Sequence, residues 1–262
     1  MLARRTPQPK KRYRPKDKPG LLEQDVADRK AFSQKYKGKN ASFWERCVAI
    51  DGKWFRLILK DQHRRWAASQ RVRGVYRRGN LAESLSSFRV KKKNKMKQKA
   101  GGSVGVIAGV CGPNQEIFFH VIQQKTRNGD EAVSFYRGLS HFLKEKYPER
   151  KKWVIIEDND PNGFKTKKAE KVKNSLGLKP IGLPKRSPDL SPLDFAVWDK
   201  IVGDMRKSEK NFPTRKQETK KRFIARLKRT AETMGRAFLK KTMRSMRNRL
   251  VACHQANGGL FE

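Results

Sequence analysis

Three aspartates occupy positions where a solvated surface charge is not the simplest explanation. Asp51 lies within an apolar run, Asp158 follows a β-branched run, and Asp194 comes three residues after a serine. Carboxylates held within a few Å of one another repel and raise one another's pKa values unless divalent cations neutralise them. Oxygen ligands of this kind suit Mg²⁺ or Mn²⁺, and two such ions about 3.5–4 Å apart can stabilise the entering and leaving oxygens of a phosphoryl displacement.

Ordinary structural roles also account for acids at such positions. Ser191-Pro192-Leu193-Asp194 is typical of a helix start, with a serine N-cap, proline at the first helical position and an acid at the third. Acids after strands are common in soluble chains. An isolated acid inside a buried strand, as expected for Asp51, is costly unless something pairs with it. The spacing alone therefore leaves caps and surface charges beside a metal site as alternatives.

The pattern of apolar residues predicts an α/β fold that can bring the three acids together. Strands are expected within residues 43–60, 103–112, 116–123, 153–156 and 179–183, and helices over 25–36, 129–147, 166–176 and from Ser191 onward. The Pro-Asn turn indicates a hairpin, so the first three strands should form an antiparallel meander. A mixed five-stranded sheet flanked by helices follows. If its first and fourth strands are neighbours, Asp51 and Asp158 meet near the carboxyl ends of strands, where open sheets place ligands.

Composition divides the chain into regions. Residues 1–22 are basic, carry prolines and predict a flexible arm. Residues 23–210 predict the α/β domain, with a basic insertion over 61–102 between its first two strands. Residues 211–262 predict basic helices whose apolar stripe packs on a core.

The positive charge indicates a polyanionic partner. Sixty-four Lys and Arg against 25 acids give a formal net charge of +39, which is typical of nucleic-acid-binding proteins and predicts salt-sensitive binding. A ribosomal or chromatin protein would show the same surplus. The lysines at 91–99, including Lys91, Lys92, Lys93 and Lys95, form either a phosphate clamp or a solvated loop. The basic segment at 9–16 is either a nuclear localisation signal or a phosphate-binding arm.

The cysteines and the lengths of the apolar runs exclude several classes of protein. Three separated cysteines without metal-ligand spacing argue against structural zinc or a disulfide framework. No apolar run is long enough to span a membrane, so we expect a soluble intracellular protein with no membrane partner, nuclear if the source is eukaryotic. We expect His120 to be a partly buried packing residue rather than a ligand, and Trp54 and Trp198 to belong to the core.

Four segments resemble the catalytic domain of the mariner superfamily of DDE/D transposases, which includes mariner and its Tc relatives. Asp51-Gly52-Lys53-Trp54-Phe55 is similar to the first-aspartate motif, and KAGGSVGVIAGV (99–110) to the G-G-x-V-M-V-W-G strand. Glu157-Asp158-Asn159-Asp160-Pro161 resembles the second motif. SPDLSPLDFAVW (187–198) resembles the third nearly residue for residue, with Asp194 where mariner proper has aspartate and the Tc branch glutamate. The resemblance covers roughly residues 21–205.

This resemblance implies an RNase H-like fold in which Asp51, Asp158 and Asp194 are catalytic and hold two Mg²⁺ or Mn²⁺ ions. It implies DNA strand cleavage and joining at transposon ends, with double-stranded DNA as partner and a homodimer as the active complex. Asn159 would orient its neighbour or contact the substrate backbone. Asp189 would be structural, fixing the turn before the helix.

Departures from the family pattern keep a second hypothesis open. Gly52 replaces the usual acidic or polar neighbour, Asp160 replaces a small residue, and Gly163 stands where histidine is common. Thirty-five residues separate Asp158 from Asp194, one more than is usual in mariner proper. The paired helix-turn-helix domains of the family have no counterpart in residues 1–22. A decayed or domesticated transposase-derived DNA-binding protein without catalysis is therefore the alternative.

Overall fold

The computed structural model describes residues 21–56, 103–111, 114–124, 126–209 and 218–261. Almost all of them belong to one compact unit, to which the description below applies. The predicted insertion at 61–102 and nearly all of the predicted arm at 1–22 lie outside the described residues, and so do Lys91, Lys92, Lys93 and Lys95. None of the helices in the described part is long and apolar enough to cross a membrane.

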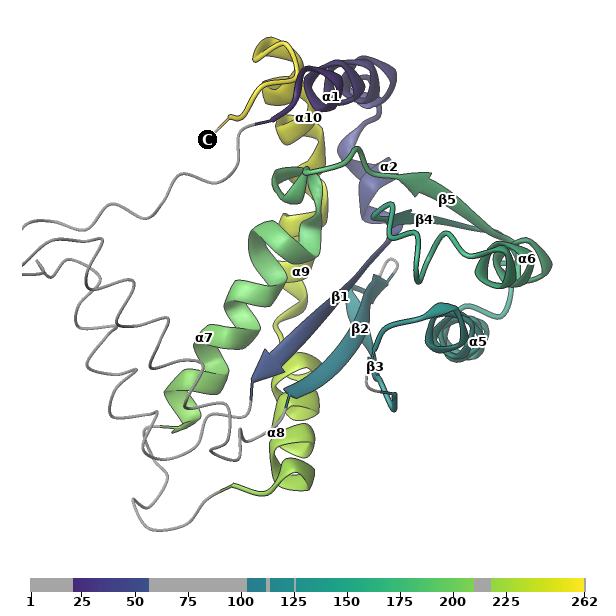
Figure 1. The fold of residues 1–262 in the computed structure, drawn as a ribbon, viewed down its shortest axis with the longest axis vertical. Helices are drawn as coiled ribbons and strands as arrows, with labels where there is room; N and C mark the ends of the chain where they lie inside the picture. Colours follow the sequence, from purple (N-terminus) through teal and green to yellow (C-terminus); the bar gives the residue numbers. More distant parts are fainter. Residues whose placement is uncertain (1–20, 57–102, 112–113, 125, 210–217, 262) are drawn as a thin grey trace, which may run out of the picture. The chain divides into compact units, whose positions relative to one another are not determined.

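A mixed sheet of five strands, ordered β3-β2-β1-β4-β5, forms the centre of the unit (Figure 1). Its strands are β1 (Val48–Arg56), β2 (Ser103–Cys111), β3 (Glu116–Val121), β4 (Trp153–Glu157) and β5 (Leu178–Gly182). β2 and β3 pair antiparallel, whereas β1 with β4 and β4 with β5 pair parallel. Gly105 lies against Trp54 and Gly109 against Val48, so β1 and β2 run in opposite directions. The predicted fold class is therefore confirmed.

Helices cover both faces of the sheet (Figure 1). One face carries α5 (Gly129–Lys146) and α6 (Lys167–Ser175), and the other carries α7 (Trp198–Glu209), α8 (Lys220–Glu232) and α9 (Arg236–Arg244). The helices α1 (Glu23–Tyr36), α2 (Ala41–Glu45) and α10 (Met246–Gln255) complete the unit, and α1 packs on α10 and α2 on α9. The amphipathic sequence of α5 explains its place, because its apolar side chains pack against sheet residues such as Ile50, Ile107 and Ile155.

Local sequence signals explain several of these boundaries. The Asn128 side chain accepts hydrogen bonds from the first turn of α5, and the Thr166 side chain does the same for α6. Gly177 follows α6 with φ of 70°, a left-handed conformation that glycine adopts readily and that ends the helix. β1 begins later than the predicted strand, because the Asn40 side chain accepts from the Phe43 backbone N–H and starts α2 instead.

Other packing predictions have mixed outcomes. Trp198 is fully buried, which confirms its core position, but Trp54 is 42% exposed and the prediction for it is wrong. Alternation along β1 points Trp54 away from the neighbouring Phe55, which is buried. His120 packs edge-on against Phe135, with its Nε2 3.0 Å from Glu131, as expected of a packing residue.

Asp189 is structural, but its contact is not local. Both of its carboxylate oxygens accept hydrogen bonds from Arg29 of α1, at 2.7 and 2.5 Å. Arg29 is fully buried and also donates to the backbone oxygens of Gly258 and Gly259. The prediction that Asp189 fixes its own turn is therefore wrong, since a buried guanidinium from the other end of the chain takes both oxygens.

Candidate active site

Asp51, within β1, and Asp158, directly after the carboxyl end of β4, lie side by side. The strands pair Val48 with Ile155 and Ala49 with Ile156, and continuing this register places Asp51 next to Asp158. Val48 belongs to the core that faces α5, so alternation along β1 turns Asp51 to the opposite face. The expected convergence of the first and fourth strands is thus present.

Asp51 is buried and held by one strong hydrogen bond. Asp51 is only 7% exposed, and the indole Nε1–H of Trp198 donates to its Oδ2 at 2.6 Å. Burial raises the pKa of Asp51 to about 6, and the nearby charge of Asp194 adds to the rise. Trp198 therefore positions this carboxylate as well as filling the core, a role that sequence reasoning missed.

Asp194 lies in a π-helical turn, η2 (Leu193–Val197), which runs directly into α7. The expected helix start is present in the backbone, since Pro192 is the first helical residue and the Ser191 backbone oxygen accepts from the Phe195 N–H. The turn is π-helical rather than α-helical, however, and among the described residues no side chain caps it. The wider turn lets the Trp198 backbone N–H donate to the Leu193 oxygen. Asp194 and Trp198, four residues apart, consequently lie on the side of the turn that faces Asp51.

Electrostatic interactions also link Asp194 with Asp158. Burial raises the pKa of Asp194, and the charge of Asp158 adds to the rise, while Lys53 and a side-chain hydrogen bond with Ser191 oppose it. Burial likewise raises the pKa of Asp158; Arg127 opposes this, and Asp51 and Asp160 add to it. The three predicted aspartates therefore interact with one another.

Arg127, from the loop between β3 and α5, places a cation beside this group. Its Nε lies 2.8 Å from Asp160 Oδ2, and its Nη2 lies 3.7 Å from Asp158 Oδ2. Nothing in the local sequence singles out this arginine, since its importance comes from a fold that places the loop beside β4. The negative charge that Asp160 adds beside Asp158 is thus offset by a specific partner.

Glu157, which also ends β4, is not part of the site. It is fully buried, its Oε1 lies 2.6 Å from Nζ of the fully buried Lys173, and the Tyr136 hydroxyl donates to its other oxygen. Like Ile155 two residues earlier, Glu157 points toward α5 and α6. The strand therefore delivers Asp158 to the site and retains Glu157 in the core.

A cavity of about 360 Å³ opens beside these acids. Its lining includes Arg127, Asp158, Asn159, Asp160 and Asp194, together with the segment from Leu183 to Pro188. The side-chain amide of Asn159 donates to the Leu183 backbone oxygen at 2.6 Å, which ties the end of β4 to the segment after β5. A substrate in this cavity would contact two of the three aspartates.

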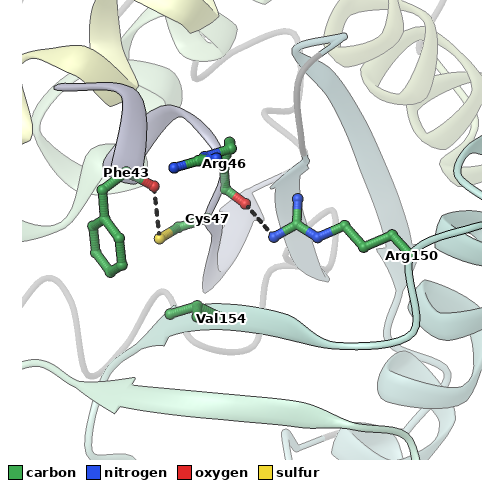
Figure 2. Close-up of a pocket in the computed structure, with 5 residues that line it drawn as sticks. All are labelled: Phe43, Arg46, Cys47, Arg150 and Val154. Carbon is green, nitrogen blue, oxygen red and sulfur yellow. Dashed lines mark hydrogen bonds between the residues drawn. The ribbon is translucent and has the colours of Figure 1, made fainter. Parts of the chain in front are cut away.

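A second cavity, of about 400 Å³, lies at the opposite ends of the same strands (Figure 2). Cys47 and Val154, near the amino ends of β1 and β4, line it together with Phe43, Arg46 and Arg150. Burial raises the pKa of the Cys47 thiol to about 12, so this thiol is protonated and a poor nucleophile near neutral pH. This second cavity therefore offers no activated nucleophile.

The side chains at the first cavity fit divalent metal by their chemistry. Carboxylate oxygens with mutually raised pKa values gain from a bound cation, and Mg²⁺ prefers such oxygens. Within the described residues, however, no three acids, histidines or cysteines converge closely enough to form a ready metal site. Asp51, Asp158 and Asp194 would hold the ions after a local rearrangement.

The sequence also matches a known family. A family model described as DDE superfamily endonuclease matches residues 61–217, more than half of the chain. The chain belongs to the DDE superfamily endonucleases. The matched part of this DDE endonuclease contains Asp158 and Asp194, while Asp51 precedes it. No curated protein matches the sequence.

Solved structures of the Mos1 mariner transposase share the fold of this DDE endonuclease. A structure of the Mos1 catalytic domain with raltegravir and Mn is 15% identical, with a TM-score of 0.64 over 92% of this chain and 98% of that chain. A Mos1 paired-end complex with the left transposon end is 15% identical, with a TM-score of 0.66 over 98% of this chain and 68% of that chain. The predicted RNase H-like, mariner-type fold is therefore confirmed.

Asp51→Asn is expected to stabilise this DDE endonuclease in the absence of divalent ions. The raised pKa means that the folded state resists ionisation of Asp51, so wild type loses stability as pH rises from about 4 to about 6. At pH 7.5 the variant should gain roughly 1–3 kcal/mol in free energy of unfolding, because asparagine can still accept from Trp198 without carrying charge. Urea unfolding measures this gain, which should vanish below about pH 4; an equal gain at both pH values would contradict the explanation.

Proposed function

We propose that this chain is the catalytic domain of a metal-dependent DNA transposase, which hydrolyses and transfers phosphodiester bonds at transposon ends by a two-metal mechanism. The observation that carries the proposal is that β1 and β4 bring Asp51 beside Asp158, and that Asp158 lines one cavity together with Asp194 from a distant segment. Membership of the DDE superfamily endonucleases supports it.

Each aspartate has a distinct structural support for this role. Trp198 fixes Asp51 through its indole N–H, while the π-turn and Ser191 orient Asp194. Asp158 follows a strand anchored by the buried Glu157. Two bound Mg²⁺ or Mn²⁺ ions would supply charge stabilisation to the entering and leaving oxygens of the phosphate. Asp51, Asp158 and Asp194 would hold and orient the ions, and Arg127 offsets the charge of the neighbouring Asp160.

Double-stranded DNA is the proposed partner, as transposon ends and as target. The net charge of +39 favours a polyanion, and the Mos1 structures with a similar fold include complexes with DNA transposon ends. We assign phosphate contacts to Lys91, Lys92, Lys93 and Lys95, and a contact with the substrate backbone to Asn159, which lines the cavity. A homodimer in the active complex and a nuclear location, if the source is eukaryotic, belong to the same proposal.

Nicking of supercoiled plasmid and joining of labelled duplex ends test the proposal. Wild-type protein should nick and join DNA with Mg²⁺ or Mn²⁺ but not with EDTA. Glu145→Gln, at an exposed acid on α5, which packs on the other face of the sheet, should keep wild-type activity because it alters charge without touching the three ligands. Equal nicking in EDTA would overturn the assignment.

A transposase-derived DNA-binding protein without catalysis is the second candidate. The observation that favours it is the lack of a ready three-ligand cluster in the described part of the chain. This protein would bind duplex DNA with an affinity that falls steeply with salt, yet neither cleave it nor bind divalent metal. DNA retention without metal-dependent nicking would select this candidate.

A further inference from the structure

Arg127 is surrounded by residues at which this chain departs from the family pattern. Its guanidinium lies over the Phe164 ring, with Cζ 5.0 Å from the ring centroid, and forms the ion pair with Asp160. On its other side lies the backbone of Gly52: a methyl group added there would meet Nη1 of Arg127, and would approach Cζ to 3.3 Å. Any larger residue than glycine at position 52 would therefore push the guanidinium away.

Gly163 and Asp160 complete the same position. A methyl group at Gly163 would come within 2.5 Å of Asp160 Oδ2, the oxygen that pairs with Arg127. Gly52, Asp160 and Gly163, which look like unrelated departures in the sequence, thus all act on Arg127. The two glycines leave room and the aspartate supplies the counter-charge.

The bonding of Arg127 is incomplete. Nη1 is buried yet has no hydrogen-bond partner among the described residues, and Nη2 is 3.7 Å from Asp158, beyond a good hydrogen bond. A buried donor without a partner is costly, so this arrangement is easy to disturb. The strong contact is the one to Asp160, and the weak one is the contact to Asp158.

Resting on the proposed function, we propose that Arg127 is a built-in counter-ion of Asp158 that divalent metal has to displace. While the guanidinium faces Asp158, this carboxylate has a cation beside it even without metal. The described acids do not yet form a ready metal site. Metal binding breaks the weak contact with Asp158, and Asp160 retains Arg127 nearby. Arg127 is thus a positioning residue that lowers metal affinity and shields the acids from one another.

The proposal is tested without relying on activity by titrating the full chain with Mn²⁺. The electron paramagnetic resonance signal of free Mn²⁺ reports how much of the ion remains unbound. Arg127→Gln should lower the Mn²⁺ dissociation constant by about tenfold, because a competing charge is removed. Gly52→Ala should lower it in the same direction by displacing the guanidinium without changing any charge. Arg137→Gln, at an exposed arginine of α5, is the matched control and should bind as wild type does. Thermal unfolding establishes that each variant is folded.

Each outcome decides between the two proposals. If both Arg127→Gln and Gly52→Ala bind Mn²⁺ more tightly than wild type and Arg137→Gln does not, the counter-ion role of Arg127 is supported. If wild type binds Mn²⁺ and Arg127→Gln binds it equally or more weakly, the counter-ion is overturned and the proposed function stands. An equal gain in Mn²⁺ affinity for Arg137→Gln would mean that net charge alone causes the effect, and it would also overturn the counter-ion role of Arg127. If neither wild type nor any variant binds Mn²⁺, the proposed function fails and this inference with it.

Discussion

Asp158→Asn is expected to lower Mg²⁺-dependent DNA nicking by at least about a thousandfold. Asp158 directly follows β4, lies next to Asp51 and lines the same cavity as Asp194, so it links the buried ligand with the exposed one. A neutral amide keeps the shape but removes a full negative charge from the proposed metal site. Metal ions supply several kcal/mol of charge stabilisation to phosphoryl transfer, and each 1.36 kcal/mol is tenfold in rate. Plasmid nicking under single-turnover conditions measures the loss.

Stability measurements separate this effect from unfolding. Asp158 is partly exposed and its pKa is raised by burial and by neighbouring acids, so Asp158→Asn should fold at least as stably as wild type without metal. Added Mn²⁺ should raise the melting temperature of wild type but not of the variant. Wild-type nicking by a folded Asp158→Asn protein would refute the role of this residue.

The order and type of the elements follow from residue patterns that the sequence shows openly. The apolar run before Glu157 predicts β4, the amphipathic run after Asn128 predicts α5, and Gly177 marks the end of α6. Alternation along a strand also explains why Asp158, rather than Glu157, belongs to the site. Local signals of this kind act within a few residues, and for that reason a single sequence reveals them.

The contacts that complete the site depend on packing between distant segments. Arg127 meets Asp160 across a loop and a helix, and Trp198 meets Asp51 across most of the chain. The π-turn around Asp194 has the serine and proline of an ordinary helix start, so the tertiary position of Trp198 rather than the local sequence distinguishes it. Such partners have no fixed spacing, and the sequence cannot reveal which arginine or tryptophan takes each role.

The second large effect is expected in the core beneath the site, where Lys173→Met should destabilise the protein by about 3–5 kcal/mol. Lys173 is fully buried, and its Nζ contacts Glu157 at 2.6 Å, the Phe164 backbone oxygen at 3.0 Å and Glu170 at 3.0 Å. Methionine fills a similar volume but leaves the carboxylate of Glu157 buried without its main counter-charge. Removing one partner of a buried ion pair is far more damaging than replacing both. Urea unfolding at pH 7.5 measures the loss.

Two further variants show whether the unpaired charge is the cause. Lys171→Met, at an exposed position of α6, should cost little, and Lys173→Met combined with Glu157→Gln should recover much of the lost stability because no buried charge remains. Burial raises the pKa of Glu157, and losing Lys173 removes the strongest opposing effect. The defect of Lys173→Met should therefore shrink as pH falls and Glu157 takes up a proton. A defect that is independent of pH and survives in the double variant would mean that packing, not charge, holds the end of β4 and with it Asp158 in place.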